Sequence, residues 1–191
     1  IESFKIKQIV IGKINKNTNE EQSNVFKELN KDYPILQSLE VFAISLDNEN
    51  SYFDFNILRK FKNLKELGID ISYNSEEVEP IDLKPLEEIE KLTDLSITGY
   101  SEKKFSLNCT LKLLEKITLG NIFNELDNLE YSKGLSQLSI KGKLKNYNFL
   151  KNYTKLEDVN ITESNFNDLF LLEKNENLKK LRIVNLNNEI S

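Results

Sequence analysis

The sequence predicts an α/β solenoid of about eight stacked repeats, with a parallel β-sheet on its concave face and helices or 3-10 turns on its convex face. The main observation is the phrase aliphatic–x–x–aliphatic–x–aliphatic, which occurs eight times. Its occurrences are Ile6/Ile9/Ile11, Leu36/Leu39/Val41, Leu64/Leu67/Ile69, Leu92/Leu95/Ile97, Leu114/Ile117/Leu119, Leu135/Leu138/Ile140, Leu156/Val159/Ile161 and Leu178/Leu181/Ile183. All 24 positions hold Ile, Leu or Val, whereas 54 such residues in 191 would fill about seven of them by chance.

The spacing of the phrase divides the chain into two kinds of repeat. The first aliphatic residues of successive units lie 30, 28, 28, 22, 21, 21 and 22 residues apart. We therefore predict one domain over residues 1–191, with longer repeats in 6–91 and regular repeats of 21–22 residues in 92–186. The end of each phrase alternates apolar and polar residues, which is typical of a strand with one buried face. A single unit of this size cannot bury that face alone, so the units must stack.

The segment after the first strand predicts a helix. Thr18 with Glu21 three residues later forms a capping-box signature, and Pro34 ends the helical pattern. The apolar face of this helix would consist of Val25, Phe26 and Leu29. We expect it to pack on the convex side as a crossover; a partner-binding helix is the alternative.

Later crossovers carry apolar residues at helical spacing, which we expect to fill the space behind the strands. These are Phe55, Leu58 and Phe61, then Leu126 and Leu129, Phe149 and Leu150, and finally Phe166, Leu169 and Leu172.

The phrase LxxLxIxx, followed by an apolar pair and by NENL before the last strand, resembles a leucine-rich repeat, and the C-terminal half is most similar to bacterial internalin-like repeats. The resemblance covers nearly the whole chain. That family usually has an Asn ladder shortly after each strand, but this chain holds other residues there: Ile14, Ile44, Ser72, Tyr100, Ile122, Lys143, Ser164 and Leu186. We expect nearby glycines to form the corners instead, namely Gly12, Gly99, Gly120 and Gly142.

Composition argues against several function classes. The net charge of −5 disfavours nucleic-acid binding, which needs a concentrated basic surface. The absence of His excludes a histidine-dependent triad and an ordinary zinc site, and no phosphate-cradling glycine motif occurs. The sequence contains no run of eighteen apolar residues, so it predicts no membrane insertion. We expect no catalytic, cofactor or metal site and no enzymatic activity.

Two features could suggest a chemical site, an acidic segment and a lone cysteine, but the surrounding sequence argues against both. The third crossover is rich in acids (Glu76, Glu77, Glu79, Glu87, Glu88 and Glu90), but it lacks the turn glycine of a calcium loop, so a solvated face is expected. The lone Cys109 has no obvious basic neighbour and is expected to be a small buried residue rather than a reactive thiol.

The last strand is followed only by VNLNNEIS, which offers no convincing polar cap for the final repeat. Either this tail folds over the edge of the sheet or flanking sequence continues the protein.

The remaining candidate surface is the concave sheet. Small residues occupy its middle, acids lie toward the N-terminal strands and bases toward the C-terminal end, and Asp94 with Lys116 and Asp158 with Lys180 are expected to be cross-strand neighbours. The predicted partner-binding residues are Glu40, Phe42, Glu66, Asp70, Asp94, Lys116, Lys141, Asp158, Lys180 and Arg182.

We therefore predict a monomeric, non-catalytic module that binds a protein partner on this face. The resemblance to internalin-like proteins implies a bacterial recognition or adhesion role and a secreted or cell-surface location, with a cytoplasmic location left open. The alternative is a structural spacer or regulatory repeat segment within a larger multidomain protein.

Overall fold

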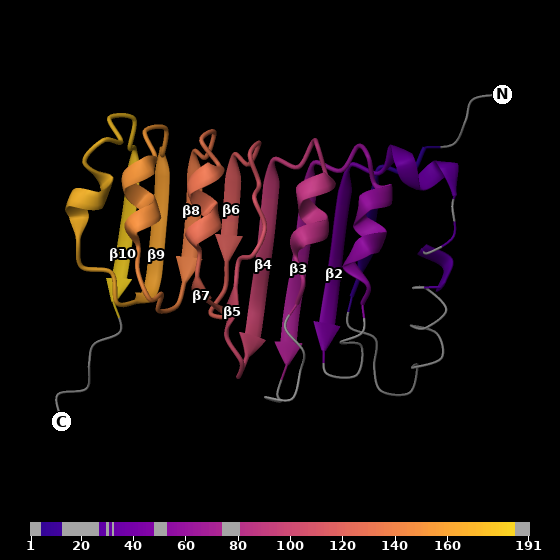
Figure 1. Cartoon of the computed structure of the whole chain (residues 1–191), viewed down its shortest axis with the longest axis horizontal. Coiled ribbons are helices and arrows are strands. Elements are labelled where there is room, and N and C mark those ends of the chain that lie inside the picture. The colour runs from indigo at the N-terminus through magenta and orange to yellow at the C-terminus, as the bar shows by residue number, and fades with distance from the viewer. Residues whose placement is uncertain are drawn as a thin grey trace.

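The computed structural model describes residues 5–12, 27–29, 31, 33–47, 53–73 and 81–185, apart from the side chains of residues 127 and 130. Eight parallel strands form one sheet in the order β1-β2-β3-β4-β6-β8-β9-β10 (Figure 1). They are β1 Gln8–Ile11, β2 Val41–Asp47, β3 Glu66–Tyr73, β4 Asp94–Ser101, β6 Lys116–Leu119, β8 Gln137–Lys141, β9 Asp158–Ser164 and β10 Lys180–Asn185. The order follows the chain, one strand per repeat, so the predicted leucine-rich repeat solenoid is confirmed.

Each strand alternates between the core and the solvent. In β3, Leu67, Ile69 and Ile71 are buried, whereas Glu66 is exposed and Asp70 is half-buried. Short helices cover the buried side of the sheet (Figure 1). We call the uncovered side the concave face.

Among the described residues, apart from the α-helical residues 27–29, the convex layer consists of 3-10 helices of four to six residues, since crossovers of this length leave little room for longer ones. These are η2 Pro34–Ser38, η3 Phe55–Lys60, η4 Lys84–Glu88, η5 Asp127–Tyr131, η6 Asn148–Asn152 and η7 Leu169–Leu172. Most predicted inward residues are buried: Phe55, Leu58, Phe61, Leu126, Leu129, Phe149, Leu150, Phe166 and Leu172. The prediction for Leu169 was wrong: it begins η7, the last described 3-10 helix, and is 59% exposed.

The predicted helix after β1 falls mostly outside the described residues. Residues 27–29 are helical, and Leu29 is buried. Pro34 begins η2, where its fixed φ angle suits the first turn.

The convex layer is interrupted between η4 and η5. Within the described residues 102–113, no 3-10 turn forms; instead β5 (Phe105–Ser106) pairs in parallel with β7 (Phe123–Glu125) in a second, two-stranded sheet that the sequence did not predict. A hollow of about 490 Å³ lies beside this segment, between Leu86 and Leu113. Cys109 lies here too and is buried, as expected.

The second repeat begins three residues later than the sequence predicted. Strand β2 pairs Phe42 with Leu67 and Ile44 with Ile69 on β3. The phrase of this unit is therefore Leu39/Phe42/Ile44, with Phe at the central position, and not Leu36/Leu39/Val41. Because Phe42 is fully buried and packs against Phe61 with ring centroids 5.3 Å apart, it fills the place that leucine holds elsewhere.

Two of the four predicted corner glycines have left-handed backbones. Gly99 has φ 109° and Gly142 has φ 118°, conformations that other residues rarely adopt. A Cβ on Gly120 would lie 2.9 Å from Thr98 Cα, so Gly120 instead permits close approach of adjacent coils. Around Gly12 nothing lies within 4 Å, and no corner role is evident there.

The Asn ladder is not wholly absent. A register shift at the end of β10 pairs Asn185 with Ser164, leaving Glu163, with φ 50°, out of the pairing. Asn185 thus takes the ladder position: its Nδ2 donates to Phe166 O at 3.0 Å, and its Oδ1 accepts from Ser164 Oγ at 2.9 Å. The sequence count missed it, because the bulge moves Asn185 by one position.

Candidate protein-binding face

Eight of the ten predicted partner-binding residues lie on the concave face. They are Glu66, Asp70, Asp94, Lys116, Lys141, Asp158, Lys180 and Arg182, all at strand positions whose side chains alternate with the core residues. The strand register brings seven of them into two cross-strand rows. The first row aligns Glu66, Asp94, Lys116, Gln137, Asp158 and Lys180, and the second places Asp70 and Lys141 on the strand positions four residues further on.

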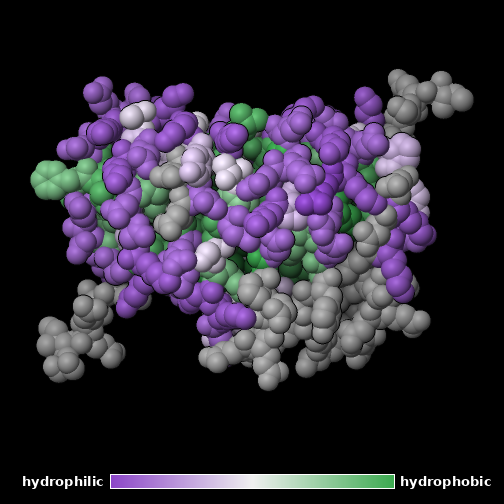
Figure 2. All heavy atoms as spheres, viewed as in Figure 1, coloured by the Kyte–Doolittle hydropathy of each residue, from purple (hydrophilic) through white to green (hydrophobic). Residues whose placement is uncertain are grey.

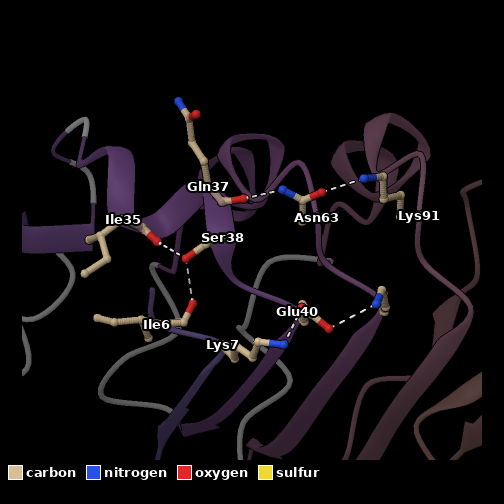
Figure 3. A network of polar contacts seen from close by, with 9 residues as sticks. Ile6, Lys7, Ile35, Gln37, Ser38, Glu40, Asn63 and Lys91 are labelled. Carbon is tan, nitrogen blue, oxygen red and sulfur yellow. Dashed lines mark hydrogen bonds and ion pairs between the residues drawn. The ribbon is translucent and has the colours of Figure 1, made fainter. Parts of the chain in front are cut away.

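Phe42 does not belong to this face. Its side chain has no exposed surface, because the register of the second repeat turns it into the core. The concave positions of β2 are Val41, Ala43 and Ser45, and the sequence missed them through the same three-residue shift. The Ser38 side chain, which precedes β2, donates to Ile6 O at 2.9 Å and Ile35 O at 2.8 Å (Figure 3).

Glu40 precedes β2 and joins three repeats at the edge of the face. One carboxylate oxygen lies 3.2 Å from Lys7 Nζ and the other 3.0 Å from Lys65 Nζ (Figure 3). The hydrogen bonds from Lys65 and Lys7 lower the pKa of Glu40. A single acid therefore accepts from bases on both neighbouring strands.

The N-terminal half of the face contains a shallow hollow of about 310 Å³. Its floor is made of small residues: a Cβ on Gly68 would be 3.4 Å from Ala43 Cβ, an ordinary contact. Its rim includes Glu66 and Asp94. Such a trough admits a partner's backbone or a large side chain beside exposed carboxylates.

Asp70 lies just beyond this hollow and is held by its neighbours. Its carboxylate accepts from Thr98 Oγ1 at 3.2 Å and from Ser45 Oγ at 3.4 Å. These two hydroxyls hold the carboxylate in place without neutralising its charge, so the charge remains available to a cationic group.

Cross-strand ion pairs organise the remaining charges. Lys116 Nζ lies 3.2 Å from Asp94 Oδ1, and Lys180 Nζ lies 3.3 Å from Asp158 Oδ2, as the predicted register required. Lys141 pairs at 3.1 Å with Glu163, which the sequence did not single out. Such exposed pairs contribute little to stability, about 0–1 kcal/mol each.

Three charges on the face have no ion-pair partner among the described residues: Glu66 and Asp70 in the acidic half and Arg182 on the last strand. Between them, Asn160 Nδ2 donates to Ser139 Oγ at 3.1 Å, while Asn160 Oδ1 has no hydrogen-bond partner in the described part of the chain. These groups therefore retain bonding capacity that a partner could use.

The described residues offer no arrangement typical of a reactive centre. No group of three or more His, Cys, Asp or Glu among them is placed to hold a metal ion. Burial, with the nearby Glu87 and Asp82 charges, raises the pKa of Cys109 to about 12, so its thiol is protonated at neutral pH. No helix in the described ranges is long and apolar enough to cross a membrane.

No family model matches the sequence, and no curated protein matches it. Two solved structures are similar to this chain: an internalin and an internalin C2, both from Listeria monocytogenes. Each is 18% identical, with a TM-score of 0.42. The first match covers 79% of this chain and the second 74%, and this chain spans 62% and 70% of the respective Listeria chains.

Proposed function

We propose that this protein is a non-catalytic recognition module whose concave face binds a protein partner. The observation that carries the proposal is the face itself: eight parallel strands present one uncovered surface on which charged side chains flank a floor of small residues. Repeat proteins use such extended surfaces for binding, because stacking leaves one face of the sheet in solvent.

The charge distribution indicates the partner's chemistry. Glu66 and Asp94 line the hollow in the N-terminal half together with Lys116, and Asp70 lies just beyond it. Of the three acids, only Asp94 is paired with a base, Lys116, among the described residues. A partner segment with Lys or Arg side chains would complement this half. The expected role is recognition or adhesion, as the internalin-like repeats imply.

The test is an affinity capture from cells of the source organism, followed by binding measurements with the purified partner. Charge reversal of the two unpaired acids, Glu66→Lys with Asp70→Lys, should weaken binding by about tenfold or more, since close charge contacts steer and stabilise such complexes. Lys151→Glu on the convex 3-10 turn η6 is the matched control and should leave the affinity unchanged.

A second double variant tests the effect of the charge pattern on binding without removing an ion pair from the protein. Exchanging the paired residues, Asp94→Lys with Lys116→Asp, keeps their ion pair but inverts the pattern that a partner meets. A concave interface predicts weaker binding with an unchanged unfolding midpoint. Unaltered affinity in both double variants would place the interface on the convex side or in the loops.

The alternative function, a spacer or regulatory segment of a larger protein, is favoured by one observation. The last repeat leaves apolar side chains exposed, among them Phe170 at 80%. Such an exposed apolar surface is suited to contact with another domain or protein.

A further inference from the structure

The crossover before β6 lacks the leucine around which the neighbouring 3-10 helices are built. Five other repeats carry a buried leucine six residues before the first aliphatic residue of the phrase, each within a 3-10 helix: Leu58, Leu86, Leu129, Leu150 and Leu172. The equivalent residue here is Asn108. Its Oδ1 accepts from Leu83 N at 3.2 Å and its Nδ2 donates to Asp82 Oδ1 at 3.3 Å. This amide therefore makes polar contacts with the preceding crossover, where a leucine would pack into the core.

The same crossover exposes a leucine where the other repeats are polar or have glycine. The residues directly before the first aliphatic residue of each phrase form a row along the edge where the strands begin: Ser38, Asn63, Lys91, Leu113, Gly134, Lys155 and Asn177. In this row, Asn63 Nδ2 donates to Gln37 O at 2.7 Å and Lys91 Nζ donates to Asn63 Oδ1 at 2.5 Å (Figure 3). Leu113 cannot continue these bonds and is 58% exposed.

Leu113 also lines the hollow of about 490 Å³ on the convex side, which we call the convex hollow. Residues of η4 and of the turn after it form one wall, and residues 110–113 form the other. The apolar lining consists of Leu86, Ile89, Leu92, Leu111 and Leu113. Figure 2 shows hydrophobic side chains reaching the surface at the upper edge of the convex side, between β4 and β6. An exposed leucine beside a hollow with apolar walls is a candidate interaction site, unlike a single leucine on a polar surface.

The arrangement of the convex layer indicates the shape that fits this hollow. The helices η3 and η4 pack together, and η5, η6 and η7 pack in series, but no 3-10 helix lies in the described residues 102–113 between the two groups. One helical turn placed against η4 would continue the layer. Side chains four residues apart on such a turn lie on the same face, so two of them can enter the hollow together.

The charges beside the hollow favour a base on its η4 wall. Glu87 and Glu90 line this wall, and neither has an ion-pair partner among the described residues. The bases of the same region are engaged on the side of the preceding repeat: Arg59 pairs with Glu88 at 3.1 Å, and Lys91 donates to the row described above. A Lys or Arg side chain brought by a partner would therefore complement this wall.

Two further contacts orient that complementarity. Glu87 Oε1 accepts from Thr110 N at 2.7 Å, so this carboxylate joins the two walls and is held in place. Lys112 lies on the opposite wall and would repel a base there. The partner's base is thus directed toward η4.

We propose that the convex hollow binds one helical turn of a partner protein, which carries an aliphatic residue and, four positions away, Lys or Arg. The aliphatic side chain contacts Leu111 and Leu113, and the base meets Glu87 and Glu90. The bound turn takes the place in the convex layer that the crossover before β6 leaves open. This site is on the opposite side of the sheet from the concave face and does not depend on the function proposed above.

A synthetic helix serves as the probe of this chemistry. A peptide of alanine and glutamine with blocked ends, about 16 residues long so that it forms a helix in water, carries Leu and Arg four positions apart at its centre. One control peptide has Glu in place of Arg, and a second has Gln in place of Leu. Each peptide is titrated to millimolar concentration into the intact, isotope-labelled protein, and the backbone amide signals are followed by NMR.

We expect the peptide with Leu and Arg to shift the amide signals of Leu111 and Leu113, but not those of Ser96 and Thr118 on the concave face. The peptide with Glu should bind about fivefold more weakly, as expected for reversal of an exposed charge contact. The peptide with Gln should bind about tenfold more weakly through loss of apolar contact. Absence of any shift with the first peptide, or equal binding of all three, would overturn the proposal.

Two protein variants introduce residues that other repeats carry at the same positions, so the fold should tolerate them. Leu113→Asn, which matches Asn63, should weaken binding by about tenfold, and Glu90→Lys, which matches Lys133, by about fivefold. Lys155→Asn, in the same row as Leu113 but two repeats away, is the matched control and should have no effect. Unchanged binding in both variants would overturn the proposal. Shifts of the same signals with protein concentration, in the absence of peptide, would identify a second copy as the occupant and would also overturn it.

Discussion

Substitution of leucine by alanine should lower the free energy of unfolding by different amounts at two equivalent positions of the repeat. Leu138 and Leu181 are both the central residue of the phrase, but Leu138 is 2% exposed and Leu181 is 46% exposed. We expect Leu138→Ala to lower the free energy of unfolding by about 3–4 kcal/mol: about 2.4 for transfer of the lost methyl and methylene groups, plus a cavity term.

Leu181→Ala should cost about 1–1.5 kcal/mol. Little more than half of the Leu181 side chain is buried, and solvent can enter the vacated space, so no enclosed cavity remains. Fraying of the last repeat before global unfolding would reduce the measured cost further.

Equilibrium urea unfolding, followed by far-UV circular dichroism, measures both losses, with equal m-values as the check that the unfolded states are comparable. Equal losses in the two variants would refute the reasoning, because they would mean that Leu181 is as enclosed as Leu138. A loss below about 2 kcal/mol at Leu138 would contradict the continuous core between strands.

Three further predictions concern the corners, the cysteine and the edge ion pairs. Gly99→Ala should destabilise by about 2 kcal/mol or more, because its Cβ would lie 1.9 Å from Ile71 O at a φ of 109°; Gly134→Ala, with 3.5 Å of clearance, is the control in the same thermal unfolding assay. Cys109, buried and with its pKa raised to about 12, should resist iodoacetamide at pH 8 in the native protein and react in urea, as mass spectrometry would show; rapid native labelling would contradict its burial. Because the pKa of Glu40 is lowered in the folded protein, its ion pairs stabilise the fold above the ordinary pKa of 4.5, and this stabilisation is lost as the pH falls through the folded-state pKa. Glu40→Gln should therefore lower the unfolding midpoint at pH 7 but not at pH 2.

The repeat itself was predictable because it depends on a local pattern. Wherever the repeat has 21 or 22 residues, as between Leu92 and Leu178, the phrase predicted the strands in the correct register, and the Asp94–Lys116 pair followed from it. The alternation of buried and exposed residues and the spacing of the aliphatic residues both arise within one repeat, so they can be recognised from the sequence of one chain.

The errors have physical causes outside that pattern. Leu36/Leu39/Val41 satisfies the aliphatic phrase, whereas Leu39/Phe42/Ile44 does not, because its central residue is aromatic. Only the pairing with β3 reveals the later register, with Phe42 in the core. Leu169 has helical spacing, but no described residue beyond η7 covers it, and spacing alone cannot show this. Asn185 reaches the ladder position through a bulge at Glu163, which depends on strand pairing and not on local preference.

The missing 3-10 turn between η4 and η5 has a mechanical consequence. The sheet runs without a break from β4 to β6, but its convex support is divided, with η3 and η4 packed together on one side and η5, η6 and η7 packed in series on the other. Across the interruption the two blocks are joined by the sheet, by the small β5–β7 pair and by the segment 105–114, which is held by isolated hydrogen bonds rather than by a packed 3-10 helix. We therefore expect bending under load to concentrate here, so that the curvature of the surface between Asp94 and Lys116 changes before any strand separates.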